Sequence, residues 1–205
     1  MIPQAATPRQ QLRRETILQI ARDMFVSEGY AAASMSAIAA RLGGSKGTLY
    51  NYFASKEELF AAVMTDHFDR VRELMKNLAL ESGDVATRLR TFGYKFLKLI
   101  LSDDYLGFYR LVTAEAARFP EIGSAFHAAG MSAHKQDLAD FFAQQITAGA
   151  LRRADPHLVA RQFLDLCRSD LQRLRVWNII GAPTDAEMRA QAAQATDAIM
   201  ALYAA

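Results

Sequence analysis

Helical periodicity of apolar residues extends along almost the whole chain, and it constrains the fold more than any other feature. The first periodic segment ends at Gly29 and has apolar residues at positions i, i+3, i+4, i+7 and i+8: Ile17, Ile20, Ala21, Met24 and Phe25. We find no convincing segment in which apolar and polar residues alternate as in a half-buried strand, and no internal repeat. The sequence therefore predicts an all-α protein.

Capping residues and glycines divide the N-terminal part into short helices. Ser34 can cap a second helix, which Gly43-Gly44 should stop. Ser45 can cap a third, and Ser55-Lys-Glu-Glu58 forms a capping box that opens a long fourth helix. Three helices, the last two joined by a tight glycine turn, indicate a helix-turn-helix motif.

The distribution of charge points to the same region. The chain of 205 residues has a net charge of only +2, which is too small to indicate nucleic acid by itself. Up to Lys56, however, the sequence holds seven basic residues and three acidic ones, so this quarter carries +4 and the remainder −2. The asymmetry favours an anionic partner for the N-terminal region.

Several other classes of protein are disfavoured by the composition. No run of about 18 apolar residues could span a membrane, and the polar N-terminus has no apolar segment like that of a signal peptide. Cys167 is the only cysteine, so neither an intrachain disulfide nor a cysteine-rich zinc site is expected. We expect a cytoplasmic protein with no membrane partner, no metal and no cofactor.

The start of the third helix suits contact with DNA in the major groove. A helix N-terminus presents free N–H groups and the positive end of its dipole to phosphate or base acceptors. Gly47 lets the backbone approach closely, while Lys46 and Thr48 supply donors, and Tyr50 and Tyr52 can pack along the sugar–phosphate backbone. The alternative is that the serine before them is only a cap and that the tyrosines only cover the core.

The segment from Ser34 to Phe60, SMSAIAARLGGSKGTLYNYFASKEELF, closely resembles the DNA-binding domain of TetR-family transcriptional repressors. The resemblance covers about residues 10–64, and the motif is long enough to be highly specific. It implies a dimer with two reading heads and a helical C-terminal domain that holds an effector. One departure is Gly44, where the family usually has an aliphatic residue. We expect a looser turn there, without an effect on any DNA-reading position.

The resemblance also implies which residues contact DNA. Phosphate contacts are expected from Ser34 or Ser36, Tyr50, Tyr52 and Lys56, and base or groove contacts from Lys46, Gly47 and Thr48; Ser45, at the helix start, completes the predicted DNA face. More weakly, the segment from Tyr109 to Glu121, YRLVTAEAARFPE, resembles the C-terminal domain of the AefR-like branch of the family.

Aromatic residues concentrate on helical stripes of the C-terminal part, which predicts a chamber for an apolar, aromatic or planar ligand. Its expected lining is Phe92, Phe96, Tyr105, Phe108, Val112, Phe163 and Trp177, with Glu115 on the same stripe as Phe108. A carboxylate among aromatic rings is costly unless it is paired or hydrated. Glu115 is therefore either the polar anchor of the chamber, favouring a cationic or hydrogen-bond-donating ligand, or a structural ion pair with Arg110 or Arg118.

The last two helices are expected to form the dimer interface. Asp155-Pro156 and Thr184-Asp-Ala-Glu187 are good helix starts. The final helix carries a narrow seam of mostly small residues, which lets helices approach closely. The predicted interface contains Leu171, Leu174, Met188, Ala192, Ala195, Ile199 and Leu202. The alternative is that these stripes only close the core of one protomer.

The sequence thus predicts three parts: a disordered arm (residues 1–9), a helix-turn-helix domain (10–55) and a helical effector-binding and dimerisation domain (56–205). The predicted function is that of a sequence-specific regulator, a homodimeric repressor released from a pseudo-palindromic double-stranded DNA operator by a small molecule. The alternative is a helical enzyme or structural protein whose motif is incidental. No nucleophile–base pair, phosphate-binding loop or metal cluster favours an enzyme.

Overall fold

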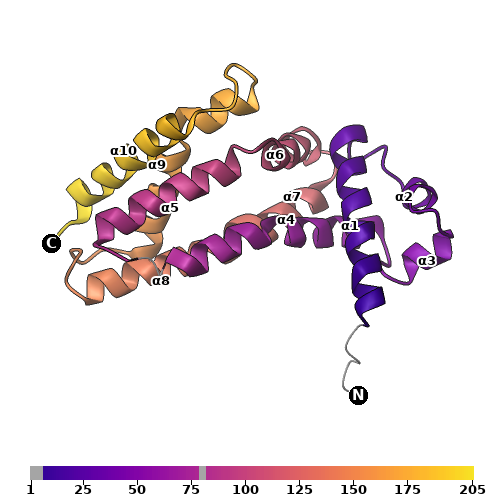
Figure 1. Ribbon diagram of the computed structural model, residues 1–205, viewed down its shortest axis with the longest axis horizontal. Helices are drawn as coiled ribbons and strands as arrows, with labels where there is room; N and C mark the ends of the chain where they lie inside the picture. The colour runs from indigo at the N-terminus through magenta and orange to yellow at the C-terminus, as the bar shows by residue number, and fades with distance from the viewer. Residues whose placement is uncertain (1–6, 79–81) are drawn as a thin grey trace. The chain divides into compact units, whose positions relative to one another are not determined.

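The computed structural model describes residues 7–78 and 82–205, and within its helices the side chains at 70–72, 74–78 and 131–135 are not described. No strand forms among the described residues, and the prediction of an all-α fold is confirmed. The helices (Figure 1) are α1 (Pro8–Glu28), α2 (Met35–Arg41), α3 (Lys46–Tyr50), α4 (Lys56–Leu78), α5 (Val85–Ile100), α6 (Asp103–Glu115), α7 (Pro120–Phe126), the π-helix η1 (His127–Ser132), α8 (Ala133–Thr147), α9 (Pro156–Val176) and α10 (Asp185–Tyr203).

The chain forms two compact units whose boundaries differ from the predicted domains. The first contains the residues up to His67 and Leu111–Ala129, and the second contains Phe68–Arg110 and Gly130–Ala205. Pro8 and Arg9, which we expected in the arm, are instead helical, because Thr7 caps α1 in a reciprocal pair with Gln10. The other residues of the predicted arm, 1–6, lie outside the described part of the chain.

Capping chemistry positions the helices of the first unit as predicted. The Ser34 hydroxyl accepts from the Ala37 N–H, and the Ser45 hydroxyl accepts from the Thr48 N–H at 3.2 Å. Between these helices Gly43 adopts a φ of +67°, a left-handed conformation that favours glycine. The α2–turn–α3 segment is therefore a helix-turn-helix set by local hydrogen bonds.

A cluster of aromatic rings holds the core of the first unit together. Tyr30, 1% exposed, lies with its ring centroid 5.7 Å from that of Phe25, 5.3 Å from Phe60 and 5.2 Å from Phe119. Such contacts stabilise a core beyond the area that they bury. Tyr30 follows the end of α1, so the ring cluster fixes the turn that leads into the helix-turn-helix.

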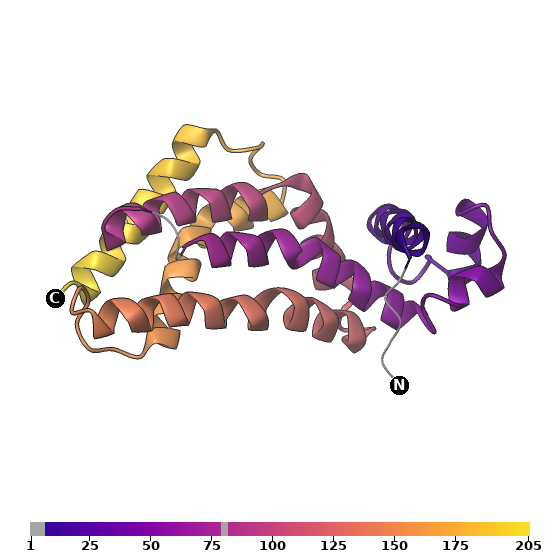
Figure 2. The same ribbon diagram turned by 60° about the horizontal axis from the view of Figure 1, so that its bottom comes forward.

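In the second unit, α10 packs along α5 (Figures 1 and 2). The approach is close because Gly93 of α5 has no side chain: a Cβ there would lie 3.0 Å from the Cβ of Ala192 and 3.3 Å from the Sγ of Cys167. Thr184 and Glu187 form the predicted capping box at the start of α10, and Asp155 caps α9 in front of Pro156.

This packing shows that the dimer-interface prediction for α10 was wrong for most of its seam. α10 packs against both α5 and α9, and Met188, Ala192, Ala195 and Ile199 are buried inside the protomer. For these four residues the alternative, closure of the core, therefore holds. Leu171 and Leu174 are half-buried. Leu202, by contrast, is 49% exposed.

Among the described residues, no helix is both long enough and apolar enough to cross a membrane. In the same part of the chain, no group of three or more His, Cys, Asp or Glu side chains is placed to hold a metal ion.

Candidate nucleic-acid interface

The predicted DNA face lies on the surface of the first unit. Ser34, Ser36, Ser45, Lys46, Gly47 and Tyr50 are exposed, and Thr48, Tyr52 and Lys56 are half-exposed. The only residue of α3 that is buried is Leu49, which anchors this short helix to its unit. The remaining positions of α3 are therefore free to face a partner.

Two contacts organise the start of α3. The hydroxyls of Ser45 and Thr48 lie 3.0 Å apart, so the capping serine is linked to both the backbone and the side chain of Thr48. The Lys46 ammonium lies 5.8 Å from the centroid of the Tyr50 ring, within the range of a cation–π contact. Both contacts involve exposed groups that a nucleic acid could reach.

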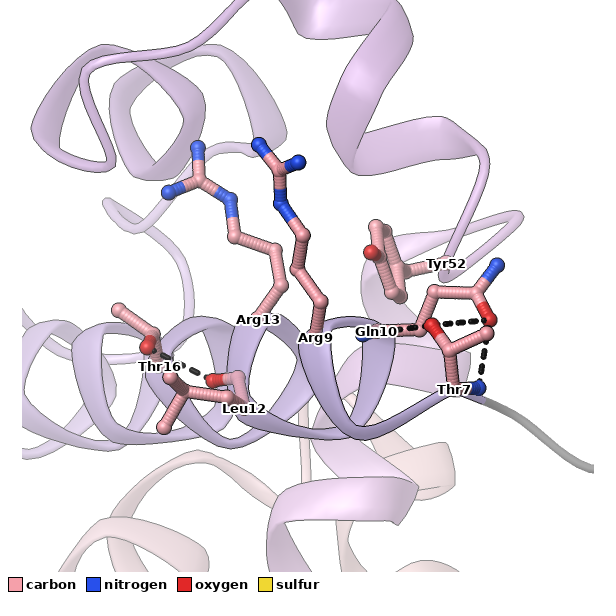
Figure 3. Close-up of a pocket in the computed structure, with 7 residues that line it drawn as sticks. All are labelled: Thr7, Arg9, Gln10, Leu12, Arg13, Thr16 and Tyr52. Carbon is pink, nitrogen blue, oxygen red and sulfur yellow. Dashed lines mark hydrogen bonds between the residues drawn. The ribbon is translucent and has the colours of Figure 1, made fainter.

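The structure adds two arginines that the motif did not identify. A pocket of about 680 Å³ near the start of α1 is lined by Thr7, Arg9, Gln10, Leu12, Arg13, Thr16 and Tyr52. Arg9 and Arg13 extend from α1 in the same direction, with Tyr52 beside them (Figure 3). Their i, i+4 spacing in a basic segment was the signal available in the sequence, but it did not show which way they point.

The other arginines of this region have partners within the first unit. Arg22 pairs with Asp66 at 2.8 Å, Arg41 pairs with Glu28 at 3.3 Å, and the Arg14 guanidinium lies over the Phe53 ring. In the part of the chain that the structure describes, neither Arg9 nor Arg13 has a carboxylate partner. The unneutralised charge of α1 is thus concentrated at its N-terminal end.

Lys56 has an intramolecular role beside the predicted phosphate contact. Its ammonium donates to the carbonyl oxygen of Tyr30 at 2.5 Å and lies 4.1 Å from the centroid of the Tyr30 ring. Burial lowers the pKa of Lys56, against the opposite influence of Glu57, Glu115 and Glu121. A phosphate contact from Lys56 stays a prediction, and it would compete with the contact to Tyr30.

Glu115 joins the end of α6 to the turn after α1. Its two carboxylate oxygens accept from the backbone N–H groups of Tyr30 and Ala31, at 2.9 and 3.0 Å. Gly29 precedes this turn with a φ of +85°, and a Cβ on it would lie 2.8 Å from the Oε1 of Glu115. The carboxylate therefore clamps a glycine turn that leads towards α2.

Neither alternative considered for Glu115 describes the contacts that it makes. Each of its oxygens already accepts a bond from a backbone N–H, so its carboxylate is not left without a partner inside the protein. It is not an ion pair with Arg110 or Arg118 either. Arg110 donates to the carbonyl oxygens of Arg175 and Val176, and the Arg118 guanidinium lies over the Phe119 ring. The carboxylate is compensated by peptide N–H groups, a partner that side-chain periodicity cannot show.

The other predicted ligand residues divide between the two units. Five of them are buried in the second unit: Phe92, Phe96, Tyr105, Phe108 and Phe163. The rings of Phe92 and Phe96 stack at 5.9 Å, and those of Phe92 and Phe163 lie 6.0 Å apart. Val112 belongs to the first unit. Trp177, at the C-terminal end of α9, is 62% exposed, so its inclusion in an enclosed chamber was wrong.

Comparisons with known proteins identify the family to which the helix-turn-helix and the C-terminal part belong. Residues 17–63 match the family described as bacterial regulatory proteins, tetR family, and residues 87–205 match the AefR-like transcriptional repressor C-terminal domain. The chain belongs to the TetR family. Both resemblances found in the sequence are thereby confirmed.

Individual TetR-family proteins show the same relationship. The chain is 38% identical over 100 residues, 49% of its length, to the transcriptional activator FasR of Mycolicibacterium smegmatis. That match spans 45% of FasR, less than half of the relative. A solved TetR-family protein from Mesorhizobium loti is 25% identical with a TM-score of 0.84, over 97% of this chain and all of that one. The flavonoid-responsive regulator FrrA is 27% identical with a TM-score of 0.77, over 95% and 98% of the two chains.

Proposed function

We propose that this TetR-family protein is a homodimeric transcriptional repressor that binds a pseudo-palindromic operator through α3. The observation that carries the proposal is the α2–turn–α3 segment, whose exposed polar face lies within residues 1–56, the part of the sequence with a net charge of +4. The residues proposed to contact DNA are Ser34, Ser36, Ser45, Lys46, Gly47, Thr48, Tyr50, Tyr52 and Lys56. Such a protein acts in the cytoplasm and needs no catalytic activity.

Retention of genomic DNA tests this function directly. Sheared fragments are passed over the immobilised protein, released with a salt gradient and sequenced. We expect the late-released fragments to share an inverted repeat with half-sites one helical turn, roughly 34–36 Å, apart or a multiple of it. If no fragment is retained at low salt, or if the retained fragments share no sequence, the proposal is wrong.

Substitutions on α3 separate reading of bases from attraction to phosphates. Thr48→Ala and Lys46→Ala should each cost about 1–3 kcal/mol of binding free energy on the enriched sequence. Binding to a scrambled duplex should change much less. Equal losses on both duplexes would show that these residues do not read sequence.

For the dimer, we propose a seam built on exposed leucines of α9 and α10. A groove of about 420 Å³ is lined by Gln162, Asp165, Leu166, Ser169 and Leu202. Leu166 and Leu202 are 37% and 49% exposed, and apolar side chains exposed side by side are typical of protein interfaces. Sedimentation velocity at low micromolar concentration tests whether the protein is a dimer.

For the effector, we propose an apolar planar molecule that binds among the aromatic side chains of the second unit. Stacked and tilted rings around Phe92 support this class of ligand, and the name of the relative FrrA points to flavonoids. A flavonoid should release the enriched duplex, and coupling requires that the duplex weaken flavonoid binding by the same factor, typically about 5–150-fold. Release by none of a panel of planar aromatic compounds would contradict this class.

Activation is the second candidate, because the relative FasR is named as an activator. A reporter gene placed behind the enriched fragment distinguishes the two. Expression that rises when the protein is deleted supports repression, and expression that falls supports activation.

A further inference from the structure

We propose that Arg9 and Arg13 bind a phosphate of the DNA backbone in the pocket near the start of α1, and that Gly44 makes the room for Arg13 to do so. This inference rests on the proposed DNA-binding function and adds a contact to it outside the helix-turn-helix motif. The occupant is a phosphodiester group, whose negative charge and oxygen acceptors match two guanidinium groups.

The two arginines form a pair without an internal counter-charge. They lie one helical turn apart on α1, extend in one direction and line the same pocket (Figure 3). Like charges at i, i+4 destabilise a helix slightly, and no carboxylate in the described part of the chain relieves them. An anion in the pocket would supply the missing charge.

Three other polar side chains of the pocket already have hydrogen-bond partners within α1 and its cap, so an anion would be bound mainly by the two arginines. Thr7 and Gln10 are engaged with each other in the helix cap, and the Thr16 hydroxyl donates to the carbonyl oxygen of Leu12. Tyr52, which the motif assigns to a phosphate contact, lies on the same side as the guanidinium groups (Figure 3). The pocket is therefore lined both by residues from the start of α1 and by a residue of the predicted DNA face.

Gly44 explains how Arg13 reaches that position. The backbone does not require glycine there, because the left-handed residue of the turn is Gly43. A Cβ on Gly44 would instead lie 3.2 Å from the Nη2 atom of Arg13 and 3.9 Å from the Cβ of Thr48. The absent side chain thus leaves space for a guanidinium beside Thr48, a predicted base-reading residue.

The experiment measures how duplex binding depends on salt. Fluorescence anisotropy gives the Kd for a labelled random-sequence duplex between 50 and 200 mM NaCl, for the wild type and for Arg9→Ala, Arg13→Ala and the double variant. Loss of this one phosphate contact in the double variant should lower the slope of log Kd against log salt by about 0.9, and each single variant should lower it by a part of that amount. Across this range the ratio of the double variant's Kd to the wild-type Kd should then fall about 3.5-fold.

Four further variants test the roles of charge, of position and of the space beside Gly44. Arg13→Lys keeps the charge and should keep the slope. Arg153→Ala removes an exposed arginine of the second unit and should leave the slope unchanged. Gly44→Val should reproduce the effect of Arg13→Ala by filling the space, and Gly44→Val combined with Arg13→Ala should be no weaker than either change alone. Far-UV circular dichroism checks that each variant is folded.

Failure of this inference can be distinguished from failure of the proposed function. A wild-type protein that binds no duplex contradicts the function itself. Salt-dependent binding with a wild-type slope for the double variant of Arg9→Ala and Arg13→Ala overturns only the phosphate pocket. A third outcome is that inorganic phosphate binds in the pocket while the salt slopes of the arginine variants stay at the wild-type value. The pocket would then bind a free anion, and the proposal would also be overturned. Additive effects of Gly44→Val and Arg13→Ala would overturn the role of Gly44.

Discussion

The helices α3 and α10 use their residues in opposite ways. Of the five residues of α3, one is buried, and the others form a surface held in place by the capping Ser45. Of the 19 residues of α10, six are buried, and its Ala192 packs against Gly93 of α5. A short helix whose residues remain exposed is suited to contact a partner, whereas small residues on a long helix can serve close packing within one protomer.

The largest effect is expected from a charge placed in the α10 packing. Ala195 is 2% exposed, so Ala195→Glu should bury an unpaired carboxylate and lower the free energy of unfolding by on the order of 3–5 kcal/mol. Urea unfolding followed by circular dichroism measures the loss. We expect any loss of dimer to accompany unfolding.

The matched control places the same side chain near the C-terminal end of α10, at an exposed position. Leu202 is 49% exposed, so Leu202→Glu should change the unfolding free energy by no more than about 0.5 kcal/mol, as other surface changes do, while weakening the dimer. If instead Ala195→Glu keeps wild-type stability and sediments as a monomer, α10 is an interface helix and the contrast with α3 is lost.

The second prediction concerns the clamp behind α3. Glu115→Ala removes two hydrogen bonds to a charged group, and the first unit should lose about 1.5–3 kcal/mol of stability. Because the clamped turn leads into α2, duplex DNA binding should weaken on specific and random sequences alike. Anisotropy and thermal unfolding, compared with the exposed Glu15→Ala, measure both effects.

Glu115→Gln sharpens this prediction. The amide keeps one acceptor oxygen but turns an NH2 group towards a backbone N–H, so its stability should fall between that of the wild type and that of Glu115→Ala. A Glu115→Gln protein that has wild-type stability and DNA affinity but altered binding of a cationic compound would return Glu115 to the ligand site.

The helix boundaries and the exposure of most α3 residues could be predicted because they depend on near neighbours in the sequence. The hydroxyls of Ser34 and Ser45 cap their helices by accepting from the backbone N–H of the residue three positions later in the chain. Glu115 could not be assigned, because its partners lie 85 and 84 positions away and are backbone groups. The prediction that the α10 seam forms the dimer interface was wrong for a related reason. A stripe of alanines indicates that another helix packs closely, but it does not show whether that helix belongs to the same protomer or to a partner.

The third prediction separates the two roles of Lys56. If Lys56 acts through the Tyr30 carbonyl, Lys56→Ala should cost about 0.5–1.5 kcal/mol of stability and leave the salt slope of duplex binding unchanged. If it contacts a phosphate, the slope should fall by about 0.9. The same anisotropy series used for Arg13→Ala measures the slope, and a fall of that size would show that Lys56 leaves Tyr30 when DNA binds.

The smallest effect is expected at the exposed end of α9. Trp177 is 62% exposed and lies 5.8 Å from the Arg173 guanidinium, so Trp177→Phe should change stability by less than about 0.5 kcal/mol, like other surface changes. Its indole fluorescence should be quenched readily by iodide, and a planar effector bound among the buried rings of the second unit should protect it little. Strong protection of Trp177 by the effector would place the ligand at the surface of α9 and contradict a buried chamber.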